Sequence, residues 1–494
     1  MIAVQTLVRK LLVKHPASFR GLLALAVLAA LTNLILGCQS YEPKPLDPTG
    51  SSQAWLSRSP ASETVRDFTM RLAASEGQID QPFDPADGLT LREAEPVALV
   101  FNRNLRVARL EANVKRATSD FAGLWEDPIA GVGLEKVVDS GANPWTFATT
   151  IGITIPISGR LEAEKQTASA DYFAVLQKIA ASEWATRATL RELWLTWSAQ
   201  VTRAELAVEL IGRLRDIDDL ARRQYEAGVL SRIDARVFAV ELASHEAKVT
   251  GEIARAKELE LQIRDILGLP PGAVVNLVPS LGFAPRVSET ESLSIAMADG
   301  NVELAAVRSA YAVAEESLNL EIRKQYPDLI VGPGYTNEFG DSRMVFGLAL
   351  PLPLWNRNQQ GVAEAVADRE VARARFETTQ EHLASLLAVA FTRFTAGRSV
   401  REALESRVVP LADQQDAEVR RVAELGRFDP LLVLTAINAQ YSAKLQLTDA
   451  REGESIGAVR LDELIGPPLP AASRVDDASV PNAISVPSSQ GVAP

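Results

Sequence analysis

The hydrophobic positions of residues 157–269 recur at steps of three and four, and no proline interrupts this stretch. Such a period predicts a long amphipathic helix on each side of Gly228, where a left-handed helix cap is easiest to form. The 228 − 156 = 72 residues from Pro156 to Gly228 would span roughly 100 Å as a helix. The pattern therefore predicts a long helical arm, a tip at Gly228 and a returning helix that ends at Gly268.

The same arm occurs a second time, at an offset of 198 residues. The shared positions are a pair of arginines before the tip, the tip glycine and the glycine that ends the returning helix. They are Arg222, Arg223, Gly228 and Gly268 in the first copy, and Arg420, Arg421, Gly426 and Gly466 in the second. Gly212 and Pro410 keep the same offset and predict a matched bend in each arm. The chain is therefore expected to be an internal duplication.

Ahead of each arm the hydrophobic period changes from 3.6 to 2, which predicts strands at about residues 129–137 and 145–156, and again at about 328–336 and 343–352. One face of these segments is apolar, and the opposite face is mostly Gly, Ala and Thr. The apolar residues expected to face lipid are Phe147, Ile151, Ile153, Ile155, Phe346, Leu348 and Leu350. This two-faced pattern over ~9–11 residues is typical of a transmembrane β-strand, whereas one isolated hairpin would favour a soluble two-layer sheet.

Each repeat is expected to begin with a further helix. In the first repeat Thr90 would cap a helix that runs to about Leu124, and Pro96 should bend it early. That helix and the returning helix, end to end, match the length of the arm, which predicts a tall helical wall. Four strands in one chain cannot close a barrel in lipid, but twelve strands from three copies can. The predicted fold is mainly α, with duplicated hairpins forming an α-barrel and four strands per chain contributing to a trimeric, twelve-stranded transmembrane β-barrel.

The amino-terminal segment predicts export and a lipid anchor. Four basic residues precede an apolar run that ends at Cys38, the only cysteine of the chain, as in a secretory signal. The sequence Ile-Leu-Gly-Cys at residues 35–38 resembles a bacterial lipobox, which implies lipidation of Cys38; the alternative is an uncleaved anchor helix. The predicted organisation is a signal peptide (1–37), an extended, lipid-anchored leader (38–88) with a short helix near residues 65–74, repeat 1 (89–280), repeat 2 (281–466) and a disordered tail (467–494).

Charge and composition exclude several classes of function. The formal net charge is −12, and removal of the signal with its four cations gives −12 − 4 = −16, which argues against a nucleic-acid partner. His15 leaves with the signal, and His245 and His382 are expected on solvated helix faces far apart. No Cys/His cluster, phosphate loop or nucleophile elbow occurs in the sequence, so no catalytic residue, cofactor site or metal site is predicted.

The duplicated helix–strand–strand–helix unit, the tips around Gly228 and Gly426, and the glycines that end the returning helices resemble the TolC-type outer-membrane efflux channels across almost all of the mature sequence. The segment Leu-Pro-Leu-Pro-Leu-Trp-Asn-Arg-Asn-Gln at 350–359 and the leader at 41–48 are similar to the cobalt–zinc–cadmium branch. The resemblance implies a homotrimer in the outer membrane that docks with a periplasmic adaptor and an inner-membrane pump. Both repeats place their paired arginines (Arg222, Arg223, Arg420 and Arg421) at the rim of the tips, so these are expected to contact the adaptor; the alternative is that they only complement the helix C-termini. The resemblance also implies carboxylates that ring the periplasmic entrance after each tip. Asp234 matches that position in repeat 1, whereas the equivalent in repeat 2 is Leu432 and Asp429 lies three residues earlier.

The resulting hypothesis is a passive export duct that depends on its inner-membrane partner for energy. A conduit for protein secretion or for drugs would need the same channel, so both stay open as alternatives. A lipid-anchored periplasmic adaptor or coiled-coil scaffold would also carry long hairpins. The two strand pairs and the duplicated hairpin argue against that class.

Overall fold

The computed structural model describes residues 41–76, 83–136, 138, 145–286, 290–338, 341–425 and 429–467. The chain divides into two compact units, Met1–Trp55 and Leu56–Pro494, and each is described by itself. The leader contains a helix, α3 (Pro48–Leu56), which begins at a proline whose missing N–H is not needed in the first turn. Asp47 Oδ1 accepts a hydrogen bond from Gly50 N at 2.9 Å. The expectation of an extended chain at residues 48–56 is therefore wrong.

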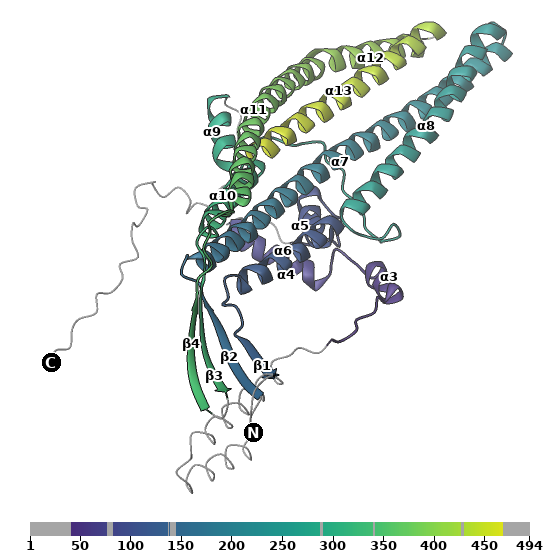
Figure 1. Cartoon of the computed structure of the whole chain (residues 1–494). Helices are drawn as coiled ribbons and strands as arrows, with labels where there is room; N and C mark the ends of the chain where they lie inside the picture. Colours follow the sequence, from purple (N-terminus) through teal and green to yellow (C-terminus); the bar gives the residue numbers. More distant parts are fainter. Residues whose placement is uncertain are drawn as a thin grey trace. The chain divides into compact units, whose positions relative to one another are not determined.

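The second unit repeats one order of elements (Figure 1). After α4 (Glu63–Glu76), the first repeat consists of α5 (Leu91–Phe101), α6 (Arg103–Phe121), β1 (Ile129–Lys136), β2 (Trp145–Ile155), α7 (Arg160–Glu226) and α8 (Arg232–Ile266). The second consists of α9 (Thr290–Gly300), α10 (Val302–Arg323), β3 (Leu329–Glu338), β4 (Asp341–Ala349), α11 (Gln359–Ala403), the π-helix η1 (Leu404–Val408), α12 (Val409–Glu424) and α13 (Pro430–Ile465). The strand bounds lie within three residues of those predicted.

The four strands form one antiparallel sheet in the order β1-β2-β3-β4. Directly opposite residues of an antiparallel pair share a face. Ile153 lies opposite Val331, and Val331 lies opposite Leu348, so the apolar residues of neighbouring strands align on one face. That face contains Val132, Leu134, Phe147, Ile151, Ile153, Ile155, Leu329, Val331, Tyr335, Met344, Phe346 and Leu348. The register thus joins the predicted apolar faces of the separate strands into one surface.

The two short helices that start each repeat meet at an asparagine. Asn102 has extended backbone torsions, and its Oδ1 accepts from Asn104 N and Leu105 N as the N-cap of α6. Its Nδ2 donates to Ile266 O of α8 at 3.1 Å, so α6 and α8 stack end to end. Asn301 repeats the arrangement at the start of α10, where its Nδ2 donates to Leu464 O at 2.8 Å. The predicted stacking of helices beside the arm is therefore confirmed at both junctions.

The predicted single helix at residues 90–124 is wrong in one respect. Thr90 and Glu93 form the expected capping box, but the helix ends at Phe101, and Pro96 lies buried inside α5 without ending it. The break occurs at Asn102 because its side chain satisfies the first amides of α6 and also holds α8. The signal for it is present in the sequence, since Asn-x-x-Leu occurs at 102–105 and again at 301–304.

The glycines that end the returning helices lie against the same junctions. Gly268 and Gly466 have φ of +67° and +85°. A Cβ at Gly268 would lie 2.2 Å from Phe101 O, and a Cβ at Gly466 would lie 1.9 Å from Gly300 O. Arginines from the connecting segments bind the carbonyls of both glycines: Arg58 donates to Gly268 O at 2.8 Å, and Arg286 donates to Gly466 O. Only glycine fits these two positions.

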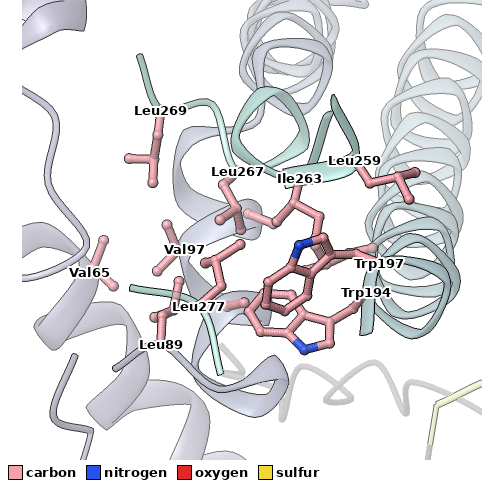
Figure 2. Packing of buried hydrophobic residues seen from close by; sticks show 13 residues of the cluster. Val65, Leu89, Val97, Trp194, Trp197, Leu259, Ile263, Leu267, Leu269 and Leu277 are labelled. Carbon is pink, nitrogen blue, oxygen red and sulfur yellow. The ribbon is translucent and has the colours of Figure 1, made fainter. Parts of the chain in front are cut away.

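The largest core joins α7 to the first junction (Figure 2). Trp194 and Trp197 make an edge-to-face contact with ring centroids 5.6 Å apart, and Figure 2 shows them beside Ile263 of α8 and Leu267, the C-cap of that helix. The Trp194 indole N–H donates to Val278 O at 3.2 Å, so the buried donor is satisfied. This core packs the middle of α7, around Trp194, against α5, α8 and the segment that leads to the second repeat.

Both arms reach the tips, but only the second arm contains a π-helix. α7 runs for 67 residues without interruption, through Gly212, which is roughly 100 Å. The buried positions before η1 match at an offset of 197 (Leu387 − Leu190, Phe394 − Trp197), and those after η1 match at 198 (Asp416 − Asp218). A π-helix holds one extra residue in a turn, so η1 absorbs a one-residue difference between the arms. The predicted matched bends are thus replaced by a continuous helix at Gly212 and a π-helix ahead of Pro410.

No helix among the described residues is both long enough and apolar enough to cross a lipid bilayer.

Candidate functional site

The first hairpin tip is built around Gly228. This residue has φ +75°, and nothing lies within 4 Å of where a Cβ would be. Gly228 N donates to Tyr225 O at 2.9 Å and Val229 N donates to Gln224 O at 2.8 Å, which closes the end of α7 as a left-handed cap. The N-cap of α8 is Ser231, so the chain reverses within a few residues. The structure therefore agrees with the predicted tip in the first repeat.

The second tip falls partly outside the described residues, and so does its predicted glycine, Gly426. α12 ends at Glu424, and Asp429 is the N-cap of α13, with its Oδ1 accepting from Leu431 N at 3.0 Å and Leu432 N at 3.3 Å. Asp429 is the repeat equivalent of Ser231, since 429 − 231 = 198. The reversal is thus capped at the same place in both repeats, by a serine in one and an aspartate in the other.

The paired arginines before the tips divide into two kinds. Arg222 and Arg420 each bind an aspartate one turn earlier, Asp218 at 2.7 Å and Asp416 at 2.8 Å. Both aspartates are buried, so each needs its arginine partner. Arg223 and Arg421 are exposed, and no ion pair holds either of them among the described residues. The structure therefore leaves Arg223 and Arg421 available at the surface and gives Arg222 and Arg420 a structural role.

The two candidate gate carboxylates both take part in helix capping. Asp234 accepts the Ser231 hydroxyl at 2.7 Å and donates its own N–H to Ser231 Oγ at 3.2 Å, in the first turn of α8. Asp429 is itself an N-cap. A carboxylate in either position also complements the positive end of the helix. Capping accounts for both residues without a gate.

Exposed apolar residues at the tips were not singled out from the sequence. On α8 the residues Ile233, Val237 and Val240 form an exposed stripe on the side opposite buried Phe238, and Ile233 is 78% exposed; Val229, just before the helix, is exposed as well. The second tip exposes Leu425 and Leu431, the latter at 72%. Their spacing of three and four residues would have revealed the stripe, but the same spacing is also expected of any buried helix face.

Polar contacts join the two hairpins near the tips. Arg213 of α7 binds Asp416 of α12 and Gln440 of α13. His245 of α8 is buried rather than solvated, which corrects the sequence-based expectation: its ring meets Tyr441 edge-on at 5.9 Å, and its Nε2 lies 3.2 Å from Glu241 Oε1. Burial, followed by the Glu252 carboxylate, raises the pKa of Tyr441. His382 is exposed, as expected.

The apolar face of the sheet is open to the surroundings. Phe346 is 79% exposed and Leu348 is 73% exposed, Ile151 and Ile153 of β2 are also exposed, and Val331 of β3 is half-buried. The opposite face carries Gly131, Gly334 and Gly347, with Thr and Ala between them. Exposed apolar patches of this extent mark an interaction with lipid or protein.

Two further predictions concern chemistry. Cys38 lies outside the described residues, so its lipidation remains a prediction. Within the described part of the chain, no group of three or more His, Cys, Asp or Glu side chains is placed to hold a metal ion.

Comparison with known proteins finds one family model and several curated relatives. Residues 296–467 match the family described as outer membrane efflux protein. The chain is 23% identical over 387 residues to the cobalt-zinc-cadmium resistance protein CzcC of Cupriavidus metallidurans, covering 78% of this chain and 92% of CzcC. It is also 23% identical over 489 residues to the probable efflux pump outer membrane protein TtgC of Pseudomonas putida, covering 90% of this chain and 95% of TtgC.

Solved structures share the fold of this chain. The outer-membrane channel OprN superimposes with a TM-score of 0.66 at 18% identity, covering 79% of this chain and 96% of OprN. At this identity the likeness concerns the fold alone.

Proposed function

We propose that this chain is an outer membrane efflux protein and forms the outer-membrane duct of a tripartite export system, as a trimer that receives its substrate from a periplasmic adaptor and an inner-membrane pump. The proposal rests on three features of a single chain: the free side of helix α6, the unpaired backbone edges of β1 and β4, and the exposed apolar face of the sheet. A closed ring of copies would cover the first two and present the third to lipid.

The equivalent helices α10 and α6 differ in how many arm helices they pack against. α10 packs between α7 and α11, whereas α6, its equivalent, packs against α7 alone among the long arm helices described. The free side of α6 carries Val107, Leu110 and Val114, all exposed. If α11 of the next copy packed on α6 as α7 packs on α10, this apolar side would be buried.

The edges of the sheet support the same assembly. β1 and β4 each pair with one strand only, so each leaves a row of backbone N–H and C=O groups unpaired. Such edges cannot remain open in lipid. Pairing β1 of one copy with β4 of the next would close them, and three copies would give twelve strands. The apolar face would then meet lipid and the small-residue face would line the lumen.

Cross-linking tests the ring. Thr167 of α7 donates to Glu316 O of α10 at 3.1 Å. Helix α11 is offset by 197 from α7, and α6 by 199 from α10, so the equivalent contact between copies joins Glu364 (167 + 197) with Ala117 (316 − 199). We expect Ala117→Cys with Glu364→Cys to give a covalent trimer on oxidation.

The control for that experiment is Thr167→Cys with Glu316→Cys, which should cross-link within one chain and leave the apparent mass unchanged. Each single variant should give no cross-linked trimer. A double variant at 117 and 364 that stays monomeric under oxidation, in outer membranes that contain the protein, contradicts the proposed ring.

The tips are the proposed docking surface for the adaptor. Exposed Arg223 and Arg421 and the apolar residues around Ile233 and Leu431 lie at the ends of the hairpins. They combine charge with apolar area, as protein interfaces do. Asp234 and Asp429 can also add negative charge at the mouth while capping their helices.

The proposed substrates are heavy-metal cations. This rests on the similarity to CzcC, whose name refers to cobalt, zinc and cadmium, and on the 350–359 segment that resembles that branch. The similarity to TtgC keeps drug export as a second candidate, because related Pseudomonas putida sequences are named as toluene and antibiotic efflux proteins. A strain that lacks the gene and loses tolerance to zinc or cadmium but not to antibiotics would decide for metal ions.

We also propose that the mature chain is anchored by a lipid on Cys38. The lipobox-like sequence before this cysteine supports the proposal, and the Gln at position 39 is compatible with sorting to the outer membrane.

A further inference from the structure

A cavity of about 800 Å³ lies where α10 and α13 meet, between α7 and α11. Its walls are mostly apolar and include Ala185 of α7, Val307 of α10, Leu386 of α11 and Ile456 of α13. The volume falls in the range of pockets that hold small organic molecules, roughly 300–1,000 Å³. None of the residues discussed above as tip, gate or lipid face lines this cavity.

Two glycines of α13 help to form the cavity. A Cβ at Gly457 would lie 3.1 Å from Phe394 Cα, so this glycine allows α13 to approach α11 closely. At Gly453 no close approach of helices requires glycine, because nothing lies within 4 Å of where its Cβ would be. A glycine inside a helix costs about 1 kcal/mol relative to alanine. The repeat equivalents of these two residues are Arg255 and Leu259 (453 − 198 and 457 − 198), so neither glycine recurs in the first repeat.

The proposed ring would not cover this cavity. The ring buries the free sides of α6 and α11, whereas the cavity is bounded by four helices of one chain. α11 directs Leu387 and Phe394 into the core beneath α9 and contributes Leu386, Val389 and Arg393 to the cavity. Leu383 and Ala390 belong to both, so the cavity borders this core along α11, and no described residue of α9 lines it.

The charges at the cavity rim are unbalanced. Arg460 is engaged by Glu192 and Glu463, and Glu303 lies in the first turn of α10, where it complements the helix end. Lys178 and Arg393 also line the cavity, and no ion pair holds either side chain in the part of the chain that the structure describes. The rim thus offers two cations beside an apolar interior.

We infer that this cavity is a binding site for an amphipathic organic anion, with an apolar body between α7, α11 and α13 and a carboxylate or sulfonate at one of the two rim cations, Lys178 or Arg393. The inference uses the proposed ring only to keep the cavity open. Binding itself does not depend on export.

The test measures binding of 1-anilinonaphthalene-8-sulfonate to the full chain in lipid nanodiscs, by fluorescence titration. Gly453→Leu should weaken binding by about tenfold or more, because the new side chain occupies the space of the ligand. Gly251→Leu is the matched control, since Gly251 is also a helical glycine with nothing within 4 Å but lies outside the cavity, in α8. It should leave the affinity unchanged.

The charged rim is tested separately with Lys178→Ala and Arg393→Gln. The variant that removes the cation bound by the sulfonate should weaken the sulfonate probe by roughly threefold, as for a partly exposed charge pair, and neither variant should affect the neutral probe N-phenyl-1-naphthylamine. Equal affinity of Gly453→Leu and the wild type would overturn the site. Equal weakening of both probes by the rim variants would overturn the anion preference. A failure of the proposed duct would appear instead as missing cross-linked trimer with probe binding intact.

Discussion

The three glycines at helix ends make a matched series, because all have positive φ but only two lie against backbone. The perturbation is a change of Gly228, Gly268 or Gly466 to alanine. At Gly228 the only cost is the left-handed backbone, about 1–2 kcal/mol for an L-residue, since its Cβ would meet nothing within 4 Å. Gly228→Ala should therefore be mild.

The two junction glycines should be far more sensitive. To restore an ordinary contact of 3.4 Å, the Cβ of Gly268→Ala must move by 3.4 − 2.2 = 1.2 Å from Phe101 O, and that of Gly466→Ala by 3.4 − 1.9 = 1.5 Å from Gly300 O. Movement of that size breaks the Asn102 or Asn301 hydrogen bond across the junction, about 1 kcal/mol each, and loosens the arginine contact. With the backbone cost, the total is about 3 kcal/mol or more for each variant.

The assay is the temperature at which the purified trimer loses helical circular dichroism, with Gly251→Ala as the control for a glycine change in an open helix. The expected order of destabilisation is Gly466→Ala and Gly268→Ala well above Gly228→Ala, with Gly251→Ala neutral or slightly stabilised. If Gly228→Ala lowered the transition as much as Gly466→Ala, the close approach at the junctions would not be what requires glycine there.

The remaining predictions concern the anchor, the sheet and the tips. Cys38→Ser should abolish palmitate labelling and leave an unprocessed or mislocalised precursor; labelling that persists in the variant contradicts lipidation at this residue. Ile153→Asp should impair membrane assembly by about 2 kcal/mol or more if it faces lipid at mid-depth. Thr154→Asp, on the other face, should be much milder, and equal loss of heat-resistant trimer from the two variants would reject the assignment of faces. Arg223→Glu combined with Arg421→Glu should abolish export and adaptor cross-linking at an unchanged trimer level, whereas intact adaptor cross-linking would limit these arginines to capping.

Much of the fold could be predicted from the sequence because its signals are local. The alternation in Trp145–Ile155 reports directly on a strand, and the glycine at 228 reports on a helix end. The capping box at Thr90 follows from two residues three positions apart. The duplication strengthened each of these signals, since a pattern seen twice at one offset is rarely accidental.

The features that the sequence did not reveal depend on contacts between distant segments. The break at Asn102 is stabilised by Ile266, which lies 164 positions further along the chain. His245 has charged neighbours in its own helix and looks solvated, yet Tyr441 of the other hairpin covers it. Arg222 and Arg223 are indistinguishable in sequence, but only Arg222 has a buried aspartate one turn before it. Tertiary partners decided each of these cases.

The π-helix at Leu404–Val408 also bears on how the two arms could have diverged. A residue inserted into a plain α-helix would rotate everything beyond it by about 100°, which would turn Asp416 and Val419 away from the other hairpin. Because η1 takes up the extra residue, the part of the second arm between η1 and the tip buries the same side as the equivalent part of the first arm. The arm thus consists of a segment before residues 404–408 and a tip segment after them, and the buried side of each is set independently. Residues 404–408 are therefore the place where the tip segment could be exchanged with that of a relative without disturbing either core.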